Sequence, residues 1–171
     1  MTKNELALFL QTWESETQRT VEMIQSLPSD QYAFRPDPQG RSVGELAWHL
    51  AEGEGVLSDT VASGRFDPSA STRIPGLRRP LDLPQLLPAF RRVHADAVAR
   101  VSNLSEAQLG KSIPFLGGRP TPVSELLWVW MLMANIHHRG QLSILCRLAG
   151  GVPPGVYGPN REEMAAFKAG S

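Results

Sequence analysis

Residues 121–151 read TPVSELLWVWMLMANIHHRGQLSILCRLAGG, and this stretch decides the fold more than any other. Thr121 is expected to cap a helix that carries Pro122 in its first turn, where proline is tolerated. The residues from 126 to 134 are apolar nearly all round, which is typical of a helix that is central or lies at a subunit interface. Gly150-Gly151 is a natural helix stop. A long helix is therefore predicted to end just before these two glycines.

Apolar residues elsewhere recur at intervals of three and four, which predicts three more long helices over about 3–27, 42–61 and 82–101. Ser42 and Glu45 form the pattern of a capping box, and so do Ser105 and Gln108 before a short helix. No convincing strand pattern or repeat is visible. We expect an all-α fold, a four-helix bundle forming a single domain over residues 1–171, with a long crossover at 64–81 between the second and third helices.

Composition excludes several classes of protein. Lys plus Arg and Asp plus Glu each number 17, so the basic excess of a nucleic-acid binder is missing. No apolar stretch approaches the roughly 20 residues that a membrane helix needs. The polar N-terminus indicates no signal peptide, and the single Cys146 cannot form a disulfide within the chain. We expect a cytoplasmic protein that uses neither nucleic acid nor a membrane.

Histidines are the candidate functional residues. His49 lies beside leucines of the second predicted helix, and His137 and His138 lie in the last one. Imidazoles on facing helices are a common way for bundles to build interior metal sites. A single histidine on an apolar face is nevertheless more often a hydrogen-bonded core residue. Adjacent residues on a helix point about 100° apart, so His137 and His138 cannot easily bind one ion.

Two segments carry a resemblance to a known family. Residues 41–50 (RSVGELAWHL) look like the start of the second helix of DinB/YfiT-like proteins. Residues 137–142 (HHRGQL), followed by 147–154 (RLAGGVPP) and 157–159 (YGP), look like the last long helix and tail of the same family. The likeness covers nearly the whole chain and implies the four-helix bundle and a homodimer.

The resemblance also implies a divalent metal, such as zinc or nickel, held by three histidines. Two of these positions correspond to His49 and His138, and the third falls at Ala134, which has no ligand atom. Three outcomes stay open: a metal-free cavity, a weaker site completed by Glu52, or one that recruits Asn135 or His137. The metal-free interpretation is slightly favoured, because two histidines alone bind a metal weakly.

Two classes of function follow. In the first, the protein is a metal-dependent hydrolase or a transferase that uses a low-molecular-weight thiol, as the resemblance implies. In the second, it is a metal-free small-molecule-binding protein, or a stress-associated dimer, without catalysis. Three further residues are expected to be structural: Glu54 a solvated charge, His94 a surface or boundary residue, and Arg139 an anchor for a loop or carbonyl.

Overall fold

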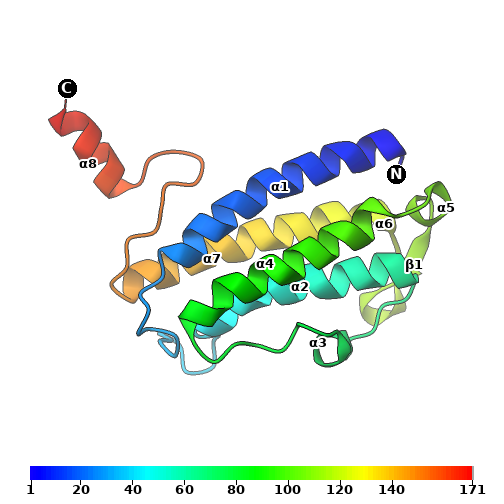
Figure 1. Ribbon diagram of the computed structural model, residues 1–171, viewed down its shortest axis with the longest axis horizontal. Helices are drawn as coiled ribbons and strands as arrows, with labels where there is room; N and C mark the ends of the chain where they lie inside the picture. The colour runs from blue at the N-terminus through cyan, green and yellow to red at the C-terminus, as the bar shows by residue number, and fades with distance from the viewer. Residues whose placement is uncertain (171) are drawn as a thin grey trace.

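The computed structural model describes residues 1–170 of the chain and is mostly helical. Four long helical segments lie side by side in the described part of the chain (Figure 1). They are α1 (Lys3–Gln25), α2 (Val43–Ser63), α4 (Leu83–Ser102), and a composite of α6 (Val123–Glu125), the π-helical η2 (Leu126–Met133) and α7 (Ala134–Leu148). Short helices α3 (Ala70–Arg73), α5 (Glu106–Leu109) and α8 (Arg161–Ala169) join or follow them.

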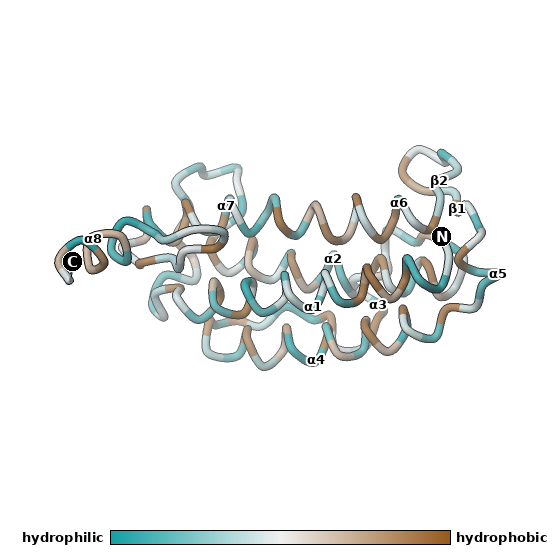
Figure 2. Tube along the Cα trace, turned by 90° about the horizontal axis from the view of Figure 1, so that it is seen from above, coloured by the Kyte–Doolittle hydropathy of each residue, from teal (hydrophilic) through white to brown (hydrophobic). Residues whose placement is uncertain are grey.

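The core lies between these segments, because each turns one apolar side inward. The helix α2 packs against both α4 and α7, and α1 packs against α4, α7 and η2. Seen from above, hydrophobic residues are distributed along all of these helices (Figure 2). Trp13, Trp48, Phe9 and Phe90 are among the largest fully buried side chains. None of the helices in residues 1–170 is long and apolar enough to cross a membrane.

Most helix starts follow from local capping. The capping boxes predicted at Ser42 and Ser105 are confirmed, since each hydroxyl accepts from the third helical amide and Glu45 or Gln108 reaches back. The prediction for Thr121 was wrong. Its hydroxyl donates to the carbonyl of Arg119, and no side chain caps the helix that begins at Val123.

The expectation of no strands was also wrong. Within residues 110–122 the chain forms a small antiparallel hairpin of β1 (Ser112–Pro114) and β2 (Pro120–Pro122), joined by a tight turn at Leu116–Gly118. Each strand has three residues, too few to show the alternation by which a strand is read from sequence. The hairpin supplies Phe115 and Leu116 to a cavity described below.

The connection between α2 and α4 packs against α2. Gly55 leaves room for the side chain of Leu77, because a Cβ on residue 55 would lie only 2.7 Å from the Leu77 methyl groups. The indole nitrogen of Trp48 donates to the carbonyl of Leu77 at 3.2 Å. This connection therefore has fixed contacts, and its Phe66 and Ser71 line the same cavity.

Arg139 joins distant parts of the chain, as expected of an anchor. Its buried guanidinium donates to the Glu16 carboxylate at 2.5 Å, to the Glu16 carbonyl at 2.8 Å and to the Tyr157 hydroxyl at 2.9 Å. Tyr157 is thus fastened to α1 and α7, and Glu162 further along the tail accepts from Arg147 of α7 at 2.8 and 3.0 Å. From this ion pair onward, α8 projects away from the long helices, and none of its residues is buried (Figures 1 and 2).

Candidate functional site: an interhelical cavity with two histidines

A cavity of about 400 Å³ opens between α2 and the η2–α7 segment. Its walls are mostly apolar, and its polar groups come from five residues: His49 and Glu52 on α2, Ser71 on α3, and Asn135 and His138 on α7. The apolar lining comes from Gly53, Val56, Leu57, Phe66, Phe115, Leu116, Trp130 and Ala134. Its volume and lining are typical of a pocket for a small molecule.

His49 and His138 meet across the cavity. Their ring centroids lie 4.8 Å apart in an edge-to-face arrangement. The Nδ1 atom of His138 lies 2.9 Å from Oε1 of Gln141, and Nδ1 of His49 lies 3.4 Å from Oε2 of Glu52. Oxygen acceptors at both Nδ1 atoms leave Nε2 as the unprotonated nitrogen of each neutral ring.

Burial lowers the pKa of His138, and the positive charge of Arg41 and the neighbouring His49 and His137 lower it further. The hydrogen bond to Gln141 opposes these effects without cancelling them. The neutral ring is therefore favoured at neutral pH. A neutral imidazole can accept a hydrogen bond from a ligand or bind a metal ion.

Ala134 lines the cavity beside His49 and His138. All three positions that the resemblance assigns to a metal site therefore converge, but one of them carries only a methyl group. Within residues 1–170, no three His, Cys, Asp or Glu side chains are grouped so that they could hold a metal ion. The residues present do not fit a site with three protein ligands.

The other candidate ligands differ in position. Glu52 and Asn135 line the cavity, whereas His137 is exposed on α7 and does not. The ring of His137 contacts His138 with centroids 5.2 Å apart. Asn135 is buried, and its amide nitrogen is bonded to a carboxylate that does not line the cavity.

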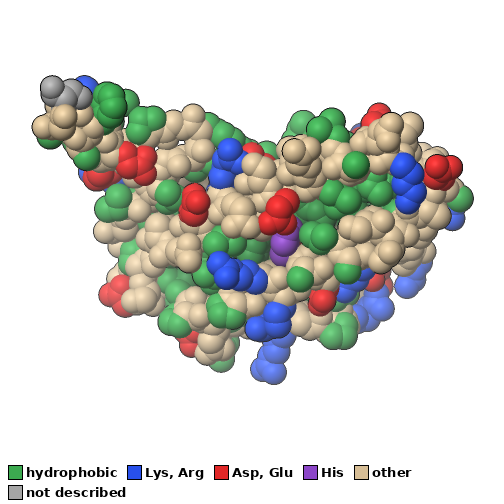
Figure 3. All heavy atoms as spheres, turned by 45° about the horizontal axis from the view of Figure 1, so that its top comes forward, with side chains coloured by type: hydrophobic (Ala, Val, Ile, Leu, Met, Phe, Trp, Pro, Cys, Tyr) green, Lys and Arg blue, Asp and Glu red, His purple; other side chains and the backbone are tan. Residues whose placement is uncertain are grey.

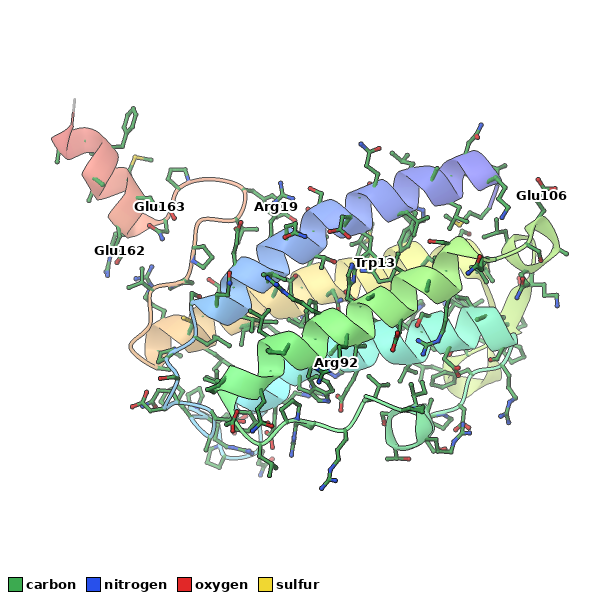
Figure 4. The ribbon with its side chains drawn as sticks, viewed as in Figure 1. Trp13, Arg19, Arg92, Glu106, Glu162 and Glu163 are labelled. Carbon is green, nitrogen blue, oxygen red and sulfur yellow. The ribbon has the colours of Figure 1, made fainter. Side chains whose placement is uncertain are left out.

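That carboxylate belongs to Glu54, which is 1% exposed. Its Oε1 accepts from Trp13 Nε1 at 2.9 Å and from Asn135 Nδ2 at 3.0 Å, and its Oε2 lies 2.8 Å from His94 Nδ1. Trp13 lies between α1 and α4 (Figure 4). One carboxylate on α2 thus joins α1, α4 and α7.

His94 extends this network to the surface. Its Nε2 lies 3.3 Å from Glu14 Oε2, and Glu14 is on an exposed part of α1. On the face drawn in Figure 3, acidic and basic side chains lie interspersed with hydrophobic ones. Burial alone would lower the pKa of His94, but its hydrogen bonds to Glu54 and Glu14 and their negative charges outweigh burial and raise it.

Comparisons with known proteins identify the family. The model of the DinB family matches residues 1–170. The chain belongs to the DinB family. It is 28% identical over 168 residues to the uncharacterized protein YrdA of Bacillus subtilis strain 168, a match that covers 93% of this chain and 92% of YrdA.

Two solved DinB-like structures are similar to this one. The protein from Bacillus cereus ATCC 10987 has a TM-score of 0.71 and 29% identity, covering 87% of this chain and 95% of its own. YjoA from Bacillus subtilis has a TM-score of 0.69 and 23% identity, covering 90% of this chain and 99% of its own, so its likeness concerns the fold. None of these DinB relatives is described by an activity.

The expectations that Glu54 is solvated and that His94 is a surface or boundary residue were wrong for this DinB protein, since both are buried. A signal was present in the spacing. Glu54 falls four residues after Leu50 and three before Leu57, on the apolar side of α2, and His94 falls four residues after Phe90. The charged residue types nevertheless predicted exposure, because charged groups are seldom buried unless they are paired.

The His94 network predicts a pH-dependent contribution to stability. The folded pKa of His94 is raised above its ordinary value of 6.5, so the stabilisation is complete below that value and is lost as pH rises through the folded pKa. His94→Gln should therefore lower the free energy of unfolding more at about pH 6 than at about pH 9. Urea denaturation at both pH values measures the difference.

The control is His94→Gln in a Glu54→Gln background, where its effect on the free energy of unfolding should depend much less on pH. A His94→Gln effect that grows toward high pH would contradict the assignment of a raised pKa.

Proposed function

We propose that this DinB-family protein binds a small molecule in the cavity between α2 and η2–α7, without a catalytic metal. The observation that carries the proposal is the cavity itself, about 400 Å³ with apolar walls and a few convergent polar groups. The ligand would be amphipathic. Its apolar body would contact Phe66, Phe115 and Trp130, and His49 and His138 would be its polar anchors.

The metal-dependent hydrolase or thiol transferase is the second candidate. The close approach of His49 and His138 favours it, because oxygen acceptors at Nδ1 are the arrangement seen behind many metal-binding imidazoles. It requires a third ligand that residues 1–170 do not supply in this arrangement. We therefore propose that Ala134 marks a lost ligand of a three-histidine site for zinc or nickel.

We further propose that the protein is a homodimer through the outer side of η2 and α7. Four side chains are exposed there: Val129, Met133, Ile144 and Leu148. Their spacings of 4, 11 and 4 residues are close to whole numbers of helical turns, so they share one side. Gly140 lies among them, and a Cβ added to it would meet nothing within 4 Å. A second copy of the chain could approach closely at this glycine. We take the whole arrangement to be a four-helix bundle with a long crossover.

A cytoplasmic location is also our proposal. Cys146 is a free, buried thiol whose Sγ donates to the carbonyl of Ser26 at 3.4 Å. Burial raises the pKa of this thiol, which disfavours the reactive thiolate. Cys146 thus acts as a small core residue, and the protein needs no oxidising compartment for a disulfide of its own.

Filling the cavity should weaken ligand binding. Ala134→Leu places a larger apolar side chain in the cavity, and it should weaken the binding of indole, an aromatic probe of suitable size, by about tenfold or more. Ala95→Leu makes the same change on the exposed side of α4 and should leave the affinity unchanged. Titration followed by backbone amide NMR shifts measures the affinity and the site. Equal affinity of both variants would refute the proposed function.

Restoring the third histidine should create a metal site. In Ala134→His, two imidazoles four residues apart share one face of α7 opposite His49, so the affinity for zinc or nickel should rise by about two orders of magnitude or more. Isothermal titration with each metal ion measures it. Adding His138→Ala should remove the gain. No gain in Ala134→His would show that the three positions do not converge on one ion.

A charge on the outer side of α7 should separate the proposed dimer. Ile144→Glu would bury an unpaired carboxylate at the interface, which is strongly unfavourable, so the species in solution should change from dimer to monomer. Sedimentation velocity gives the mass of each form. Leu8→Glu, at an exposed leucine of α1, is the control and should stay dimeric. A wild-type protein that sediments as a monomer would overturn this proposal.

A further inference from the structure

Asn135 lies between two environments, and each end of its amide faces one of them. It is 7% exposed and lines the cavity, yet its Nδ2 atom lies 3.0 Å from the buried Glu54. We propose that Asn135 is a specificity-determining residue whose fixed amide oxygen selects ligands carrying an N–H or O–H donor, and that Glu54 is the positioning residue that fixes it. This inference rests on the proposed ligand-binding function.

The orientation of the amide follows from the groups around Glu54. Trp13 Nε1 can only donate, and it donates to the same Oε1 that Asn135 contacts. His94, whose pKa is raised, donates to Oε2. A carboxylate surrounded by three donors is an acceptor at both oxygens. The reversed Asn135 amide would set Oδ1 against Oε1, two acceptors at hydrogen-bond distance, so Nδ2 must be the atom that faces Glu54.

The amide oxygen is then the atom that does not face Glu54. Oδ1 lies near Gly53, another cavity residue, since a Cβ on Gly53 would be 3.4 Å from it. Within residues 1–170 no donor bonds to Oδ1, and no fully buried side-chain oxygen or nitrogen there lacks a hydrogen-bond partner. Oδ1 is therefore accessible, and the cavity is the space that Asn135 lines. The absence of a side chain on Gly53 keeps this approach open.

These features define a class of ligand. Phe66, Phe115 and Trp130 suit an aromatic or aliphatic body, and Oδ1 suits a neutral donor attached to it. A ligand of the same shape without the donor would displace water from Oδ1 and leave this oxygen unpaired. A site that contains such an acceptor discriminates against the analogue that cannot donate.

The test compares indole with benzothiophene, which has the same shape but carries sulfur in place of the N–H group. The wild-type protein should bind indole about three- to tenfold more tightly, the range expected for one hydrogen bond. Asn135→Leu should remove this preference. Glu54→Gln, which lets the Asn135 amide turn, should reduce the preference while leaving the affinity for benzothiophene nearly unchanged, which a merely structural role of Glu54 would not do.

The outcomes separate the two proposals. If both probes bind equally to the wild-type protein, or if Asn135→Leu keeps the preference for indole, the role of Asn135 is refuted while the ligand site stands. If neither probe binds, or if Ala134→Leu binds both as the wild type does, the proposed function itself fails. The comparison of the two probes on the wild-type protein needs no substitution, so it can refute the role of Asn135 even if a variant does not fold. Backbone amide spectra of each variant check its fold.

Discussion

The hydrogen bonds to one buried carboxylate connect the long helices of this protein. Glu54 on α2 is held by Trp13 on α1, His94 on α4 and Asn135 on α7. A charge in the interior is strongly destabilising unless its hydrogen-bonding capacity is met, and here three donors meet it. The relative positions of the helices are constrained by these contacts, since sliding any one of them would leave a buried polar group without its partner. The cavity shares Asn135 with this network, so its geometry depends on the same contacts.

Much of the helical fold could be predicted from sequence, because its signals are local. The capping boxes at Ser42 and Ser105 and the stop before Gly150 need only neighbouring residues. The hairpin around Leu116 could not be predicted, since three-residue strands are specified by their pairing and not by a pattern. The π-helical turns at Leu126–Met133 likewise have no signature in a stretch that is apolar on every side.

The site shows the same division between local and distant information. The resemblance pointed to His49 and His138, and the structure places their rings together at one cavity with Ala134. The sequence could not show which partner each polar side chain bonds to. Glu54 and His94 bond across helices that are about 40 residues apart in sequence, so their burial became evident only once α2 and α4 were packed. Membership of the DinB family supports the fold, whereas the chemistry of the cavity is inferred from the individual residues that line it.

The contacts of Arg139 bear on the order in which the chain can fold during synthesis. Glu16 is made early, but Arg139 follows it by 123 residues and Tyr157 by 141. While the chain is still on the ribosome, α1 can pack against α4, yet its side toward η2 and α7 lacks a partner until those segments have emerged. Contacts of such large sequence separation slow folding and expose apolar surface in the meantime. Glu16 on α1 therefore completes its hydrogen bonds only after Arg139 and Tyr157 have been made.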